Sequence, residues 1–118
     1  MKTNNLKNID KGDLKTLTSC VNFLTEEGYE AQFKVVKGGL KSLATDKIYQ
    51  SGDVSIISFY RFEGESDPAD NAILYVIETD SGERGTLIDA YGAYSDPHVD
   101  AFIKEVENIK KEHMKVKV

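Results

Sequence analysis

The segment Ala72-Ile-Leu-Tyr-Val-Ile-Glu-Thr79 decides the fold, because it predicts a strand with apolar side chains on both of its faces. Successive side chains of a strand point to opposite faces of the sheet. In this segment both alternating sets are apolar: Ile73, Tyr75 and Ile77 on one face, Leu74 and Val76 on the other. The pattern is typical of a central strand that is covered on both sides, or of a strand in the middle of the core.

The sequence on either side of this segment predicts further strands. The tight connection Asp80-Ser-Gly-Glu83 leads into residues 85–91, which return as an antiparallel partner. Residues 54–62 are rich in β-branched and aromatic side chains and predict another strand. An earlier stretch alternates strictly and predicts a half-buried strand. Its apolar face holds Tyr29, Ala31, Phe33 and Val35. Residues 40–50 suit a short strand or an irregular excursion equally.

Two helices are expected to flank the strands. The first begins at Asp10 or Asp13, either of which can cap it, and ends before Gly28, since its apolar residues recur at three- and four-residue steps. The second is capped by Ser95 or Asp96 and has a proline in its first turn, where a missing N–H costs nothing.

The order of these elements predicts an α+β fold, written α-β-(β)-β-β-β-α. Consecutive strands with short connections cannot pair in parallel, because a parallel pair needs a crossover of a dozen residues or more. We therefore expect an antiparallel sheet of about four strands, with the N-terminal and the C-terminal helix packed on it. A chain of 118 residues suits one domain. We expect a flexible N-terminus over residues 1–9 and a single α+β domain over residues 10–118.

The composition limits the cellular compartments and the classes of binding partner that suit this chain. The net charge is −5, whereas proteins that bind the phosphate backbone usually have a basic face, so we expect no nucleic-acid partner. A single cysteine, Cys20, fits a reducing cytosol and is expected to be a small buried residue. No stretch approaches the ~20 apolar residues that cross a bilayer, so we expect a cytoplasmic protein without membrane contact.

Two acidic-aromatic segments, residues 60–71 and 89–96, supply the candidate site. The first holds an acidic loop that can be a solvated connection or a loose site for a hard cation. Arg61 can form a structural ion pair with Glu63 or Asp89, or an anion-binding fork. The tyrosines near residue 92 can line a pocket for a polar ligand or form a corner that pins the last helix. The candidate ligand-binding surface is Tyr60, Arg61, Glu63, Asp67, Asp70, Asp89, Tyr91, Tyr94 and Asp96.

The common catalytic sets are absent from the sequence. Its two histidines, His98 and His113, are fifteen residues apart, and with one cysteine they form no zinc pattern. Neither glycine-rich stretch has the spacing of a phosphate or dinucleotide loop. We assign no catalytic residue and expect no cofactor and no dedicated metal site. Whether the protein is an enzyme stays open, and the absence of a catalytic set favours a protein that is not an enzyme.

The two segments also carry a resemblance. The strings Tyr60-Arg-Phe-Glu-Gly-Glu-Ser-Asp-Pro-Ala-Asp70, Ile73-Leu-Tyr75 and Asp89-Ala-Tyr-Gly-Ala-Tyr-Ser-Asp96 resemble a family of short bacterial proteins, some labelled phosphoribosylpyrophosphate synthetase. The label implies phosphosugar chemistry, and residues 75–86 look like a phosphoribosyl-binding strand and loop. Such a loop needs a parallel strand–helix context, whereas here a hairpin is expected. We therefore expect no synthetase activity.

Two functional hypotheses follow. The first is a non-enzymatic binding or interaction module, which would hold a protein or a small polar ligand on the candidate surface. The alternative is a small enzyme or cation-dependent phosphate-ligand protein, with Glu63, Asp67, Asp70 and Asp89 on the cation and Arg61 on the phosphate. The hairpin of residues 72–90 predicts that Arg61 and Asp89 lie at the same end of the sheet. The oligomeric state is not predicted.

Overall fold

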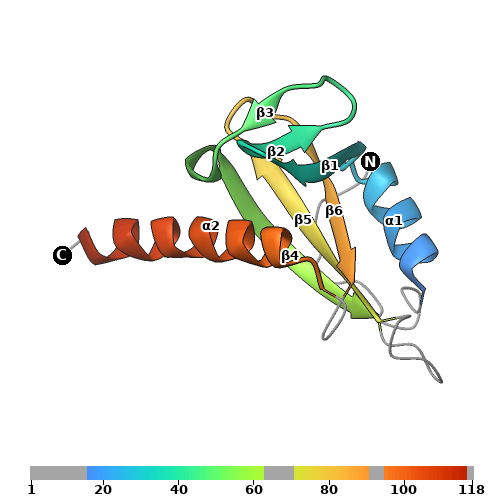
Figure 1. Cartoon of the computed structure of the whole chain (residues 1–118). Coiled ribbons are helices and arrows are strands. Elements are labelled where there is room, and N and C mark those ends of the chain that lie inside the picture. Colours follow the sequence, from blue (N-terminus) through green and yellow to red (C-terminus); the bar gives the residue numbers. More distant parts are fainter. Residues whose placement is uncertain (1–15, 63–70, 91–94, 117–118) are drawn as a thin grey trace.

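The computed structural model describes residues 16–62, 71–90 and 95–116, with side chains up to Ile109. The described elements, in chain order, are α1 (Leu17–Glu26), β1 (Ala31–Val36), β2 (Gly39–Ser42), β3 (Ile48–Tyr49), the short 3-10 helix η3 (Ser51–Asp53), β4 (Val54–Phe62), β5 (Ala72–Thr79), β6 (Arg84–Ala90) and α2 (Pro97–Val116). Their arrangement is drawn in Figure 1. The α+β class is confirmed.

The sheet differs from the predicted one in strand number and direction. It has six strands in the order β3-β2-β1-β6-β5-β4. The ambiguous residues 40–50 contribute most of β2 and all of β3, and these two strands are the excess over four. All neighbours are antiparallel except β1 and β6, which pair in parallel. The expectation of a fully antiparallel sheet was wrong, because the rule on short connections says nothing about strands far apart in the chain.

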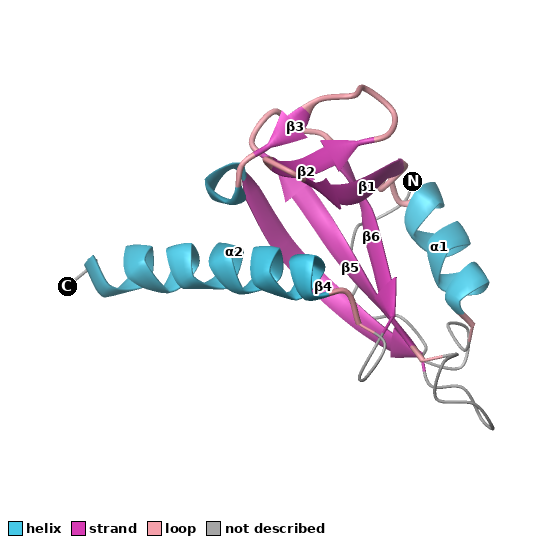
Figure 2. Ribbon diagram, in the orientation of Figure 1, coloured by secondary structure: helices cyan, strands magenta, loops and turns pink. Residues whose placement is uncertain are grey.

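The two helices cover opposite faces of the sheet (Figure 2). On the α1 face, Cys20 and Leu24 of the helix pack against Leu74 and Val76 of β5. On the α2 face, a larger cluster joins the helix to all six strands and includes Phe33, Ile73, Tyr75, Ile77, Leu87, Val99, Phe102, Ile103 and Val106. Strand β5 is therefore buried from both sides, as its double apolar pattern predicted, and Cys20 is fully buried as expected.

The ends of α1 show where local sequence rules held and failed. Gly28, with φ of 102°, follows the helix, and the N–H of Tyr29 donates to the carbonyl of Leu24, as in a Schellman cap. At the other end the cap is Thr16, whose hydroxyl accepts from the N–H of Ser19. The predicted caps Asp10 and Asp13 lie outside the described residues, and Thr16 takes their role for this helix.

The predicted apolar face of residues 29–35 is divided between the two layers. Ala31 and Phe33 pack on the α2 face, with Val35 against the same cluster. Tyr29 instead packs in the α1 cluster, which contradicts the predicted grouping. The reason is local: Tyr29 precedes β1 and still belongs to the cap of α1, so the alternation of side chains starts only at Ala31.

Candidate functional site

The strand register brings Arg61 and Asp89 onto one face of the sheet. Arg61 lies opposite Ile73 across β4 and β5, and Ile73 lies opposite Asp89 across β5 and β6. Side chains directly opposite one another in a sheet share a face, and Ile73 belongs to the α2 face. The prediction that Arg61 and Asp89 share an end of the sheet agrees with this register. Two strand spacings, or about 10 Å, separate their backbones.

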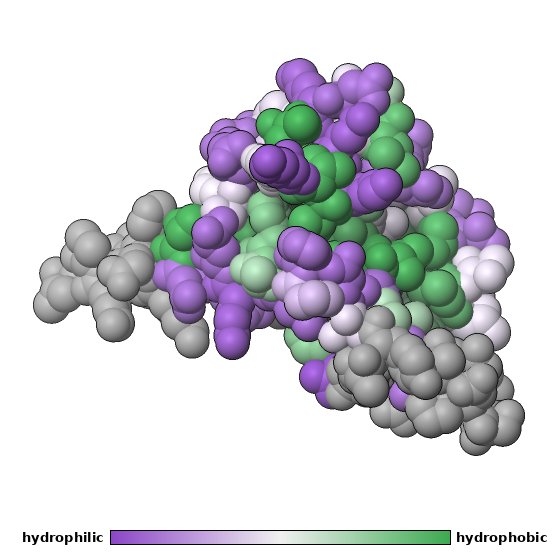
Figure 3. All heavy atoms as spheres, viewed as in Figure 1, coloured by the Kyte–Doolittle hydropathy of each residue, from purple (hydrophilic) through white to green (hydrophobic). Residues whose placement is uncertain are grey.

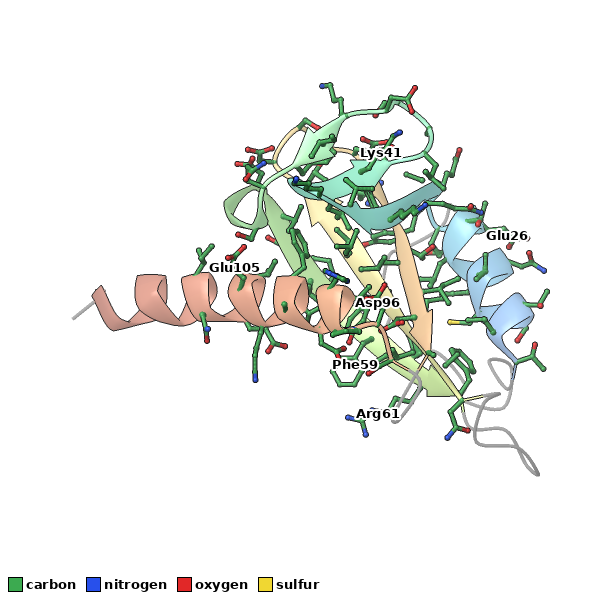
Figure 4. All side chains as sticks on the ribbon, in the orientation of Figure 1. Glu26, Lys41, Phe59, Arg61, Asp96 and Glu105 are labelled. Atoms are coloured by element: carbon green, nitrogen blue, oxygen red, sulfur yellow. The ribbon has the colours of Figure 1, made fainter. Side chains whose placement is uncertain are left out.

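Arg61 lies in an open cavity between β4 and α2. Its guanidinium stands 5.5 Å from the centre of the Phe59 ring, and Figure 4 shows both side chains at the same end of β4. Arg61 itself is exposed, so it does not form a buried ion pair with Asp89. The cavity has a volume of about 240 Å³ and is lined by Phe59, Arg61, Ile73, Tyr75, Asp100, Ile103, Lys104 and Glu107.

Tyr75 lies on the floor of this cavity and responds to the charges around it. Its side chain is 9% exposed, and this burial raises the pKa of its hydroxyl. The carboxylates of Asp100, Asp89 and Glu107 raise the same pKa further, whereas the charge of Arg61 lowers it. The cavity lining therefore has mixed charge, because it combines Asp100 and Glu107 with Arg61 and Lys104.

Asp89 attaches the last helix to the sheet. Its carboxylate accepts hydrogen bonds from the backbone N–H of Ala90, at 2.7 Å, and of Asp96, at 3.2 Å. Burial raises the pKa of Asp89, and these two hydrogen bonds act against that rise. The carboxylate thus holds the residue before α2 against the end of β6. The predicted pinning of this helix was assigned to Tyr91 and Tyr94, which lie outside the described residues, so the contact of Asp89 is a separate attachment.

Asp96 caps α2, as one of the two predicted choices. Its carboxylate accepts from the backbone N–H of His98 at 2.8 Å and contacts the His98 ring at 3.1 Å. The hydrogen bond from the backbone of His98 lowers the pKa of Asp96. Ser95, the other predicted cap, donates to Asp100 instead. Asp96 is exposed. It caps the first turn of α2 and does not line the cavity around Arg61.

The other predicted residues do not join Arg61 in the described structure. Tyr60 points to the opposite face and packs against the α1 cluster, as expected from its place beside Arg61 on a strand. Glu63, Asp67, Asp70, Tyr91 and Tyr94 lie outside the described residues. Within the described ranges, no group of three or more His, Cys, Asp or Glu side chains is placed to hold a metal ion.

The sequence reasoning missed the groove that continues from the cavity along β4. A second hollow of about 500 Å³ shares Phe59 and Glu107 with the first and runs between β4, η3 and α2. Its apolar lining is Val54, Ile56, Ile57, Phe59, Val106 and Ile109. Figure 3 shows apolar side chains reaching the surface on the face that α2 crosses. The apolar residues of β4 occupy both alternating sets, and both sets reach core clusters: Val54 and Ile56 on the α2 face, Tyr60 and Phe62 on the α1 face. The sequence pattern therefore gave no signal that Ile57 and Phe59 stay exposed.

A bulge interrupts β4 beside these exposed residues. The register with β5 shifts between Ile56 and Ser58, so Ile57 is an extra residue without its own partner. A bulge interrupts the alternation of side chains and bends the strand. Ile57, at the bulge, is 44% exposed, and Phe59, which is again in register opposite Tyr75, is 51% exposed. The exposed apolar pair therefore lies in the middle of the strand.

A second polar cluster, also missed, lies at the other end of the sheet. The carboxylate of Glu83 accepts hydrogen bonds from the hydroxyls of Ser42, Tyr49 and Thr45. Burial alone would raise the pKa of Glu83, but these hydrogen bonds and the charge of Lys47 lower it overall. Ser42 is fully buried and every hydroxyl in the cluster has a partner, so the cluster fastens the β2–β3 hairpin to the β5–β6 turn.

Comparisons with known proteins give no relative: no family model, no curated protein and no solved structure matches the chain significantly. Of the described helices, none has the length and apolar character needed to span a membrane. The candidate site must therefore be interpreted from its own geometry.

Proposed function

We propose that this protein is a binding module that takes a protein partner onto β4 and the groove between β4 and α2. The observation that carries the proposal is the exposed apolar edge of the sheet. Strand β4 is the last strand, pairs with β5 on its inner side and has no partner on its outer side within the described part of the chain. Ile57 and Phe59 are exposed along it.

The contrast between the two sheet edges supports this proposal. An exposed edge strand can pair with another chain, and proteins commonly prevent this with short edge strands, charged residues, proline or β-bulges. At one edge, β3 has only two residues. At the other edge, β4 has nine residues, contains no proline and has one charged side chain, Arg61 near its end. The first edge is protected by its shortness. The second is long and apolar, and its one protective feature besides Arg61 is the bulge at Ile57, so pairing is open on the part of the strand that follows the bulge.

The groove beside β4 adds the second requirement of a protein-binding site. Main-chain pairing at a sheet edge supplies affinity, and pockets beside the edge select side chains. The groove offers apolar walls along most of its length and a charged end, where Arg61 and Lys104 lie near Asp100 and Glu107. Such a surface fits an extended segment with apolar side chains and a polar end.

Site-specific crosslinking tests the proposal. A photoreactive benzoylphenylalanine replaces Phe59, and the same residue replaces Ile48 as the matched control, because both side chains are 51% exposed and lie at opposite sheet edges. In cells that naturally express the chain, we expect discrete protein adducts from position 59 and not from position 48. Absence of adducts at position 59, or the same adducts from both positions, would overturn the proposal.

A further inference from the structure

We infer that the outer face of strands β1, β2 and β3 docks on a membrane surface that contains anionic lipid. The outer face is the side of these strands that points away from α2, and it carries Gln32, Lys34, Lys41, Leu43 and Ile48. The inference goes beyond the proposed function, because it concerns a different part of the sheet and a different kind of partner. It rests on the charge of the outer face, on its exposed apolar residues and on the position of α1.

Lysine is concentrated in this part of an otherwise acidic chain. Residues 31–49 hold one acid, Asp46, and four lysines, which are Lys34, Lys37, Lys41 and Lys47. Four lysines against one aspartate give this part a net charge of +3, whereas the whole chain carries −5. A local positive field on a protein that is negative overall attracts an anionic partner to that place.

Two of these lysines lie directly opposite each other in the sheet. Lys34 of β1 is the register partner of Lys41 of β2, and Lys41 is the partner of Ile48 of β3. Like charges in opposite positions destabilise a strand pair. Lys41 contacts Asp46 at 3.6 Å, but that carboxylate is 83% exposed, and such surface pairs contribute little. Anionic headgroups beside the two ammonium groups would remove the repulsion.

Protection of a sheet edge does not explain this row of side chains. Lysine commonly protects edge strands from pairing with another chain. Here β1 and β2 are both interior strands, and the edge strand β3 places the apolar Ile48 in the same row as Lys34 and Lys41. The two lysines therefore mark a face of the sheet and not its edge.

Apolar side chains share the outer face with the lysines. Ile48 is 51% exposed and Leu43 is 52% exposed. Leu43 continues the alternation of β2, because its N–H donates to the carbonyl of Gln32 at 2.8 Å, so its side chain points to the same side as Lys41. At a membrane interface, aliphatic side chains enter the acyl boundary, while the long stems of lysines let their ammonium groups stay at the headgroups. The outer face combines both kinds of side chain, as a lipid surface requires.

Helix α1 leaves the outer face open. Within the described residues, the core cluster under α1 takes its strand residues from β4 and β5 and none from β1, β2 or β3. Figure 1 shows α1 beside β6 and the start of β1, with β2 and β3 beyond it. The acids Glu26, Glu27 and Glu30 lie where α1 meets the start of β1, and Figure 4 shows Glu26 well apart from Lys41. The docking surface is therefore the half of the sheet toward β2 and β3.

Docking through the outer face leaves β4 accessible. Strands β3 and β4 form the two opposite edges of the sheet, so five strand spacings, or about 24 Å, separate them. Figure 4 shows Lys41 and Arg61 at opposite ends of the molecule. The chain can thus lie on lipid and hold a protein on β4 at the same time. The expectation of no membrane contact depended on the lack of a spanning segment, which a protein that lies on the surface does not need.

The expected binding is reversible. Each lysine near an anionic surface strengthens binding about fivefold, so a net of three charges contributes about a hundredfold. Burying the exposed half of Ile48 and of Leu43 adds about fivefold for each residue.

Co-sedimentation of the purified full chain with vesicles tests the inference. We expect binding to phosphatidylcholine vesicles with about 30% phosphatidylserine to be at least about tenfold stronger than to phosphatidylcholine alone. Salt at about 1 M should weaken it. Lys34→Gln and Lys41→Gln should each weaken it about fivefold, and the double variant about 25-fold. Lys104→Gln is the matched control, because Lys104 is an exposed lysine on α2, and it should leave vesicle binding unchanged. Circular dichroism checks that each variant is folded.

A fluorophore on the outer face gives the independent measurement. An environment-sensitive dye is attached to Ile48→Cys, and to Ile57→Cys at the other sheet edge as the control. The native Cys20 gives little background labelling, because it is fully buried and burial raises the pKa of its thiol to about 11. On addition of the phosphatidylserine vesicles, we expect the emission to shift to shorter wavelength at position 48 and not at position 57.

The outcomes separate this inference from the proposed function. Equal binding to both kinds of vesicle, or binding that the double lysine variant leaves unchanged, overturns the inference. A dye that responds at position 57 and not at position 48 also overturns it. Discrete protein adducts from position 48 in cells, without vesicle binding, would assign the outer face to a protein instead. In the first two cases the proposed function on β4 stands or falls by its own crosslinks from position 59.

Discussion

Replacing Gly85 with alanine should separate β1 from β6, the parallel pair that the sequence did not predict. Gly85 lies opposite Ala31 across these strands. A Cβ atom added at Gly85 would stand 2.0 Å from the carbonyl oxygen and 2.5 Å from the carbonyl carbon of Ala31. Both atoms belong to the backbone, so no side-chain rotation can relieve the contact. The strands must move apart by more than an ångström to reach a normal separation.

The free-energy cost follows from two contributions. Forcing an extra methyl group into a packed site costs about 1–3 kcal/mol, and the rigid backbone neighbour places this case at the upper end. Separation also weakens one or two main-chain hydrogen bonds of the ladder, at about 1 kcal/mol each. We expect Gly85→Ala to lower the free energy of unfolding by about 3–4 kcal/mol, out of a total of roughly 5–15 kcal/mol for such domains.

Urea denaturation measures this cost. With a slope of about 1–2 kcal/mol per molar urea, the midpoint of Gly85→Ala should fall by roughly 2–3 M. Gly52→Ala is the matched control, because nothing lies within 4 Å of its added Cβ, and its stability should change by less than about 0.5 kcal/mol. Equal midpoints for the two variants would refute the close β1–β6 packing.

Two further predictions concern ionisable groups. In the folded protein the pKa of Glu83 is below its ordinary value of 4.5. The ionised carboxylate therefore stabilises the fold at every pH above 4.5. This stability is lost as the pH falls through the lowered pKa of the folded state. Glu83→Gln should therefore lower the urea midpoint at neutral pH and flatten its fall in acid; an acid profile parallel to that of the native chain would contradict this. Burial raises the pKa of Cys20 from 9.0 to about 11, so its thiolate fraction near pH 8 falls about a hundredfold. A thiol reagent should label it at least that much more slowly in buffer than in urea, and equal rates would contradict its burial.

Several features of the candidate site were readable from the sequence. The hairpin of β5 and β6 follows from two apolar strands joined by a tight turn, and its register brings Asp89 onto the face of Arg61. The cap Asp96 and the following proline marked the start of α2. A corner of tyrosines that pins the last helix was one of two alternatives, and those tyrosines lie outside the described residues; the hydrogen bond from the N–H of Asp96 to Asp89 is a pinning contact that neither alternative named.

The groove could not be predicted from the sequence. Its apolar residues are plain in the sequence, but their exposure is not. An apolar pattern shows that Ile57 and Phe59 suit a strand, but it does not show whether that strand lies inside the sheet or at its edge. Strand β4 is an edge because β1 pairs with β6 rather than with β4. The register shift at Ile57 then breaks the alternation of side chains, so the pattern alone does not give the faces of the residues that follow.

By itself, the sequence determined the features that depend on residues close together in the chain. The type of most elements, the cap of α2, the C-terminal cap of α1 and the double apolar pattern of β5 follow from spacings of a few residues, since turns, caps and side-chain alternation are local. Only the tertiary structure decided the parallel pairing of Ala31 with Gly85 and the edge position of β4. These depend on contacts between distant segments, whose free energy comes from jointly buried surface and close backbone packing that no local spacing records.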